Sequence, residues 1–121
     1  RVRGVTRKII YIQNAQSDVS ATQAQYQAAV ESIANYYLNR GYEVMIGLSC
    51  FNPGGATTGQ YDTLKAARAA ALASLKAGSN GAKVFDGADL YTAMGSTGPM
   101  AAGGGFIGGL RSAHQDAGAV L

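Results

Sequence analysis

Three short apolar runs, separated by two long amphipathic segments, form the main pattern of this chain. Residues 7–13 contain the continuous apolar stretch Ile9-Ile10-Tyr11-Ile12, which is typical of a strand covered on both faces. The other two runs lie at residues 42–50 and 82–85. Because these runs are short and rich in β-branched and aromatic residues, they predict three β-strands.

The segments between the runs have helical periodicity. Ser20 and Gln23 have the spacing of a capping box, so the first helix is expected to run from there to residue 40, with Gly41 as its C-cap. The second helix is expected at about residues 61–76, followed by Gly78. Each helix has one apolar stripe that predicts its buried face. The stripes are Val30, Ile33, Ala34, Tyr37 and Leu38 in the first helix, and Leu64, Ala67, Ala71, Leu72 and Leu75 in the second.

The element order predicts the fold class. Asp89 is expected to cap a short helix, residues 95–111 form a glycine-rich loop, and Ser112 caps a last helix ending at residue 121. The order β-α-β-α-β-α predicts one α/β domain over residues 1–121, a three-layer α/β/α arrangement with a small parallel sheet, flavodoxin-like in type. So small a sheet leaves its first strand without a neighbour. Residues 1–8 are therefore expected to add a strand or to leave that edge to a partner.

The basic residues are concentrated at one end of the chain. The formal net charge is +3, but Arg1, Arg3, Arg7 and Lys8 all fall within the first eight residues. A nucleic-acid-binding domain usually spreads its basic residues along one face, with aromatic residues between them. The pattern therefore predicts a basic arm at residues 1–8 and argues against a nucleic-acid partner.

The composition also excludes several kinds of site. Cys50 is the only cysteine and His114 the only histidine, so we expect no intrachain disulfide, no metal site and no other cofactor. No stretch approaches the roughly 18 apolar residues of a membrane span. The glycines at 103–105 lack the following lysine of a phosphate loop. The Cys50 thiol is expected to be a small buried hydrophobe rather than a nucleophile.

Three short motifs resemble the SGNH/GDSL hydrolase family. The strand IIYIQ leads into Ala15-Gln16-Ser17-Asp18, where the family has a Gly-x-Asn-Asp block. Residues 40–44 (RGYEV) match the family's strand entry, and residues 111–118 (RSAHQDAG) match its late Asp-x-x-His block. The resemblance covers roughly residues 8–121 and implies the C-terminal two thirds of an SGNH-hydrolase-like fold.

The chain departs from this family at the catalytic positions. The Gly-Asp-Ser block that carries the nucleophile has no counterpart, since only the basic arm precedes Ile9. Ser17 stands at the position of the oxyanion-hole asparagine, and Arg111 stands where the family has the acid that orients the histidine. Only His114 remains, and a base without a nucleophile and an orienting group does not complete a triad.

The resemblance and its departures together imply a non-catalytic SGNH-like module that binds a glycan, forms oligomers or does both, as in the terminal domains of phage tail spikes and fibres. The ligand would lie at Gln16, Ser17, Asp18 and His114. The protein partner would be a second copy or a neighbouring domain at the sheet edge. The chain has neither an initiator Met nor a signal-peptide pattern, so we expect part of a larger chain, in a virion or outside the cell.

Several alternatives stay open from the sequence. If a serine-bearing strand lies outside the chain, the chain is the C-terminal fragment of a carbohydrate esterase or deacetylase, with His114 as base and a small acyl-sugar as ligand. His114 is otherwise a surface or helix-start histidine with a polar contact. Asp18 is expected either to line a site at the strand end or to cap the following helix.

Overall fold

The structure is a computed structural model that describes residues 6–14, 16–51 and 56–94. Its parallel sheet has the strand order β1-β2-β3, with β1 at Ile9–Ile12, β2 at Glu43–Leu48 and β3 at Val84–Asp89. Helix α1 (Gln23–Leu38) connects β1 to β2, and helix α2 (Thr58–Ala77) connects β2 to β3. The smaller elements are the 3-10 helices η1 (Gln16–Ser20) and η2 (Gly81–Lys83) and the short helix α3 (Leu90–Ala93). The prediction of an α/β protein with a small parallel sheet is confirmed.

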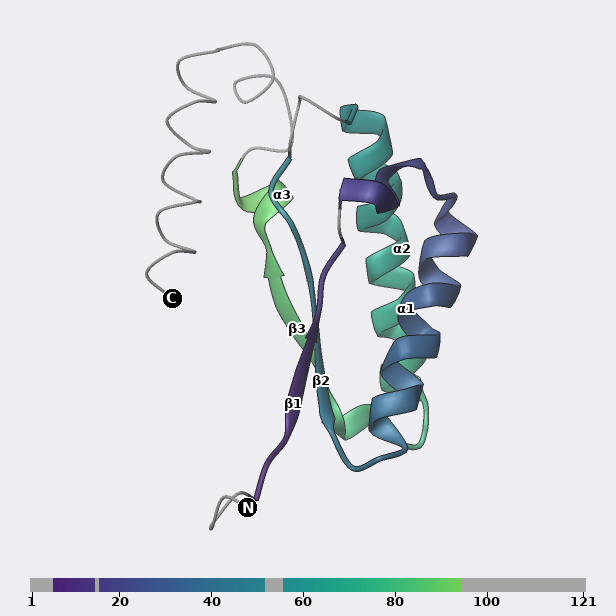
Figure 1. Cartoon of the computed structure of the whole chain (residues 1–121), viewed down its shortest axis with the longest axis vertical. Coiled ribbons are helices and arrows are strands. Elements are labelled where there is room, and N and C mark those ends of the chain that lie inside the picture. The colour runs from purple at the N-terminus through teal and green to yellow at the C-terminus, as the bar shows by residue number, and fades with distance from the viewer. Residues whose placement is uncertain (1–5, 15, 52–55, 95–121) are drawn as a thin grey trace.

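Both long helices lie on the same face of the sheet (Figure 1). Each strand pairs with the next strand in the sequence, and right-handed connections between such strands place successive helices on one side. The strand residues beneath the helices are buried: Ile12, Val44, Ile46, Leu48 and Val84. The described residues thus form two layers. The helix expected at 112–121, which would supply the third layer, lies outside them.

Helix α1 begins two residues later than expected. Thr22 is its N-cap: the Thr22 hydroxyl accepts from the backbone N–H of Gln25, and the Gln25 side chain accepts from the N–H of Thr22. Ser20 belongs to η1 instead. The capping box predicted at Ser20 and Gln23 is therefore wrong in position, because η1 takes up the residues that were assigned to the start of the helix.

Gly41 ends this helix region, as predicted. Its backbone N–H donates to the carbonyl of Leu38, and the N–H of Tyr42 donates to the carbonyl of Tyr37, both at 3.1 Å. These two bonds form a Schellman motif. Gly41 has a φ of +84°, a conformation that costs a residue with a side chain more than it costs glycine.

The buried face of α1 follows every fourth residue. Tyr26, Val30, Ala34 and Leu38 are each at most 6% exposed. Ile33, which the stripe predicts to be buried, is 45% exposed, and Tyr26, which lies outside the predicted stripe, is buried. Since α1 packs against α2 as well as against β1 and β2, its contact face is set by both neighbours and not by its apolar stripe alone.

The predicted buried stripe of α2 is confirmed, but the helix begins earlier than predicted. Thr57 and Gln60 form its capping box, and all the stripe residues are buried, as is Tyr61. Strand β3 lies later than predicted, because Ala82 belongs to η2. Asp89 caps α3 as predicted, through a 3.0 Å bond from the backbone N–H of Thr92.

The two segments that flank this fold are described only in part. Residues 6–8 of the basic arm do not form a strand, so β1 is an edge strand within the described part of the chain. Residues 1–5 and the predicted glycine-rich loop at 95–111 lie outside the described residues. Whether residues 1–5 add a strand beside β1 stays a prediction.

Candidate functional site

The carboxyl ends of β1 and β2 are joined by a buried polar network. Asn14, which follows β1, is only 5% exposed. Its Nδ2 donates to Ser49 Oγ at 2.8 Å, and its Oδ1 accepts from the backbone N–H of Ser49 at 2.9 Å. Ser49 Oγ also lies 3.2 Å from the Tyr61 hydroxyl of α2. Open α/β sheets bind ligands at this edge, and Ser49 carries a hydroxyl there. That hydroxyl is held between the Asn14 amide and the Tyr61 phenol.

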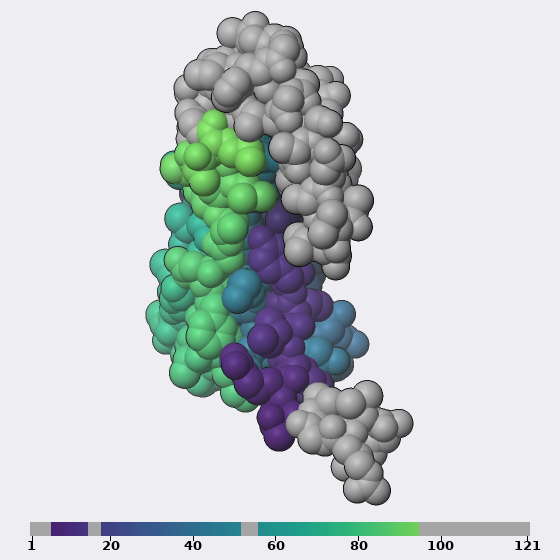
Figure 2. All heavy atoms as spheres, turned by 90° about the vertical axis from the view of Figure 1, so that its left-hand side faces the viewer, coloured from purple at the N-terminus to yellow at the C-terminus, as the bar shows by residue number. Residues whose placement is uncertain are grey.

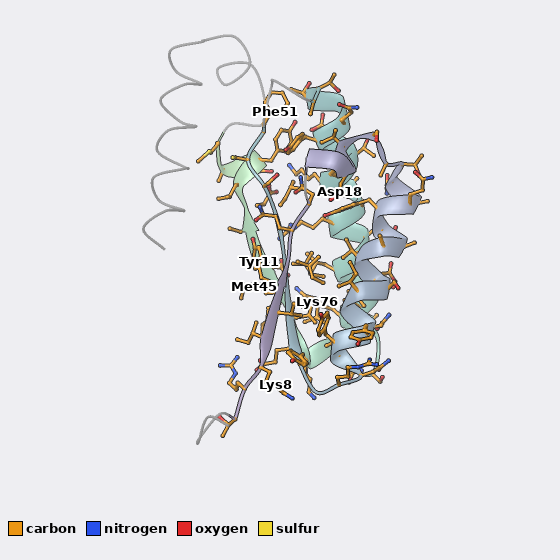
Figure 3. All side chains as sticks on the ribbon, in the orientation of Figure 1. Lys8, Tyr11, Asp18, Met45, Phe51 and Lys76 are labelled. Atoms are coloured by element: carbon orange, nitrogen blue, oxygen red, sulfur yellow. The ribbon has the colours of Figure 1, made fainter. Side chains whose placement is uncertain are left out.

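Three aromatic rings pack together next to this network. Phe51, Tyr61 and Tyr91 are all buried, and Phe51, at the carboxyl end of the sheet, stands edge-on to Tyr61 with 5.4 Å between ring centroids (Figure 3). The Tyr91 hydroxyl donates to Asp62 Oδ1 at 2.8 Å. Burial, followed by that carboxylate, raises the pKa of Tyr91 to about 12. Tyr91 therefore stays protonated at neutral pH and acts here as a structural donor.

Asp18 lies in η1, close to the interface of η1 with α2. Burial is the main reason why the pKa of Tyr26 rises to about 12; the Asp18 carboxylate raises it further and Arg68 opposes the rise. Arg68 itself donates to the carbonyls of Ile46 at 3.1 Å and Gly87 at 2.9 Å, which ties α2 to β2 and β3. Asp18 is not the cap of the following helix, because Thr22 has that role.

The structure places only part of the predicted ligand site. Asp18 follows the carboxyl end of β1, as expected for a residue that lines such a site. Gln16 and Ser17 belong to the same 3-10 helix, but their side chains are outside the described part, as are His114 and Arg111. A ligand site at Gln16, Ser17, Asp18 and His114 therefore stays a prediction.

Cys50 is half-buried just after β2, and burial raises the pKa of its thiol above the ordinary value. A raised pKa leaves less thiolate at neutral pH, and the thiolate is the reactive form. We therefore expect Cys50 to react with iodoacetamide more slowly at pH 7 than the cysteine of an unstructured peptide, and to regain the peptide's rate in denaturant. Equal rates for the peptide and the folded chain at pH 7 would contradict this prediction.

The face of the sheet opposite the helices has an exposed apolar row. Tyr11, Met45 and Phe85 are aligned across the three strands; Tyr11 is 46% and Phe85 38% exposed, and Ile9 beside them is 51% exposed. Figure 2 shows this face, with β1 in purple and β3 in green. Among the described residues, α1 and α2 both cross on the other side, so none of these elements covers β1 on this face, and its coverage on both faces stays a prediction.

Tyr11 lies across this face over two glycines. A side chain on Gly47 would overlap the Tyr11 hydroxyl, and a Cβ on Gly87 would lie 2.8 Å from ring carbon Cε2. The Tyr11 hydroxyl donates to Gln13 Oε1 at 3.1 Å. Glycine at neighbouring positions of β2 and β3 therefore allows the ring to lie close to the backbone while almost half of the residue stays exposed to solvent.

The charged residues near this face are largely paired. Arg7 donates to both carboxylate oxygens of Glu43, at 2.6 and 2.7 Å, and this bond lowers the pKa of Glu43 below its ordinary range. Lys76 of α2 pairs with Asp86 of β3 on the opposite, helix-covered side of the sheet. The apolar row thus has one neutralised ion pair, Arg7–Glu43, beside it.

Neither a metal site nor a membrane-spanning helix is found among the described residues. No three histidine, cysteine or acidic side chains there gather closely enough to hold a metal ion. No helix in the same ranges is both long and apolar enough to cross a bilayer. Comparisons of the chain with protein-family models, with curated proteins and with solved structures found no significant match.

Proposed function

We propose that this chain is a non-catalytic α/β module that assembles with a second copy through the sheet face that the described residues leave uncovered. The observation that carries the proposal is the apolar row on this face of a parallel sheet, formed by exposed Tyr11 and Phe85 with the partly buried Met45 between them. Parallel sheets occur almost only with both faces covered, and exposed apolar patches mark interaction surfaces. A second copy fits this face because Arg7, beside the row, is paired with Glu43 within its own chain, so that this ion pair adds little like-charge repulsion between two identical faces.

The groups at the strand ends support a non-catalytic role. The Ser49 hydroxyl is engaged by Asn14 and Tyr61, and the raised pKa of Cys50 disfavours its thiolate. A nucleophile needs a base within hydrogen-bond reach, and these contacts instead give both groups a structural role. The esterase alternative depends on His114 and on a serine from outside the chain. Hydrolysis of p-nitrophenyl acetate by a longer chain, abolished in His114→Ala, would favour it.

The SGNH-like and tail-spike parts of the interpretation remain proposals, and the strand order supports them. In the flavodoxin-like order 2-1-3-4-5, the last three strands are neighbours in sequence order. The order β1-β2-β3 is what the C-terminal part of such a sheet would contain. In that arrangement further strands lie beyond β1, and the module belongs to a larger chain, as in a virion fibre.

A glycan is the second candidate for the same face. The Tyr11 ring lies flat over Gly47 and Gly87 and is 46% exposed, so it presents a rigid aromatic surface with a polar tip. Such a surface suits the C–H face of a sugar ring. A monomeric chain in which a glycan shifts the Tyr11 resonances would favour this candidate over self-assembly.

Phe85→Ala is expected to weaken self-association by about tenfold, because it truncates an exposed aromatic group of the proposed interface. Sedimentation equilibrium of the full chain measures the effect. The matched control is Tyr36→Ala, since Tyr36 is an aromatic residue of α1 that is 52% exposed away from this face. A wild-type chain that stays monomeric at high concentration, or equal effects of the two variants, would contradict the proposal.

A further inference from the structure

A polar hollow of about 200 Å³ lies between the C-terminal parts of α1 and α2, in the helical layer rather than on the open face of the sheet (Figure 1). Its floor consists of Leu38 and Leu75, which are 3% and 6% exposed. Its walls carry a carboxylate, two amides and a hydroxyl, those of Glu31, Asn35, Asn80 and Ser74. The hollow therefore combines a small apolar base with a ring of hydrogen-bonding groups.

The Glu31 carboxylate is held in place by its neighbours. Gln27 Nε2 donates to Oε2 at 2.8 Å, and Ser74 Oγ donates to Oε1 at 2.9 Å. A carboxylate has about four acceptor positions, so Glu31 can accept further bonds from a ligand. The lining includes no lysine or arginine. An anion is therefore disfavoured, and a ligand that donates hydroxyl hydrogens is favoured.

We propose that this hollow binds one neutral sugar ring. Amide and hydroxyl groups both donate and accept, which suits the alternating hydroxyls of a pyranose, and Glu31 accepts from a hydroxyl through a charge-assisted bond. Leu38 and Leu75 contact the C–H face of the ring. The volume equals that of about seven waters at ~30 Å³ each, which is room for about one ring. This site is independent of the open sheet face, so either proposal can fail alone.

Titration of the ¹⁵N-labelled full chain with glucose, galactose or N-acetylglucosamine tests this proposal. For at least one of these sugars we expect saturable shifts of the Asn35 and Asn80 side-chain amides, with a dissociation constant in the millimolar range. Glu31→Gln keeps the shape but removes the charge, so it is expected to weaken binding about tenfold. The Ser32→Ala variant is the control, because Ser32 is an exposed serine of α1 that does not line the hollow.

Three outcomes would overturn the proposal. The first is the absence of saturable shifts with all three sugars, or shifts that are confined to Tyr11 and Phe85. The second is a response to glycerol as strong as the response to the sugars, since any polyol would then suffice. The third is equal weakening by Glu31→Gln and Ser32→Ala. Retained amide dispersion in the spectrum of Glu31→Gln separates lost binding from lost folding.

Discussion

Asn14→Ala is expected to lower the free energy of unfolding by about 2–3 kcal/mol. Asn14 is almost fully buried and makes two bonds to Ser49, one through each atom of its amide group. Alanine removes both hydrogen bonds and leaves the backbone N–H of Ser49 without the Asn14 Oδ1 acceptor. An unsatisfied buried donor costs more than the average hydrogen bond contributes. The carboxyl ends of β1 and β2 also lose the side-chain link between them.

Urea denaturation of the full chain measures this effect. The matched control is Asn35→Ala, because Asn35 is an exposed residue of α1 where alanine is a better helix former. We expect a change within about 0.5 kcal/mol for the control. If the two variants lose similar stability, the buried network contributes nothing specific and the assigned role of Asn14 is wrong.

Gly81→Ala is expected to lower the free energy of unfolding by about 2 kcal/mol, within the range for overpacked sites. A Cβ at Gly81 would overlap the carbonyl oxygen of Lys76 and lie 2.7 Å from its carbonyl carbon. These atoms belong to the backbone of α2, so relief requires a shift of the helix end. A Cβ at Gly47 would likewise meet backbone, since the carbonyl oxygen of Ala88 lies 2.9 Å away in addition to the Tyr11 hydroxyl.

Gly59→Ala is the control for this prediction. Gly59 lies in the first turn of α2, and the nearest atom to a Cβ there is Thr57 Oγ1 at 3.8 Å. Alanine is favoured over glycine in a helix by roughly 0.5–1 kcal/mol, so this variant is expected to gain stability. Thermal unfolding of both variants measures this difference. If the close contact at Gly81 determines the result, and not the loss of a glycine, the two variants shift the melting temperature in opposite directions.

Local sequence patterns predicted the helices and strands, and contacts between these elements changed which of their residues are buried. The stripe of α2 and the cap at Asp89 depend on nearby residues, and both predictions are confirmed. The burial of Tyr26 and the exposure of Ile33 depend on how α1 meets α2. No periodicity within one helix contains that information. The placement of α1 and α2 on one side was also hard to predict, because the side on which a helix crosses is a property of strand order.

The polar network was less accessible to prediction than the fold. Asn14 and Ser49 lie 35 positions apart, and their pairing requires the register of β1 against β2. One feature of the sequence could have identified this pair: each of the two residues lies one or two positions beyond the end of a strand. Aligning the predicted strand ends would have brought them together. Asp18, the one predicted ligand residue whose side chain is described, lies in η1 after β1 and does not cap α1; its role in lining a ligand site stays a prediction.

The sequential strand order also has a consequence for how the chain folds. The main contacts between elements join successive strands and successive helices, so a β-α-β unit can form before the rest of the sheet is in place. A further strand and helix can join at either margin of the three strands without any rethreading of the chain. Growth of the sheet, by evolution or by engineering, therefore requires only that each added unit brings its own helix.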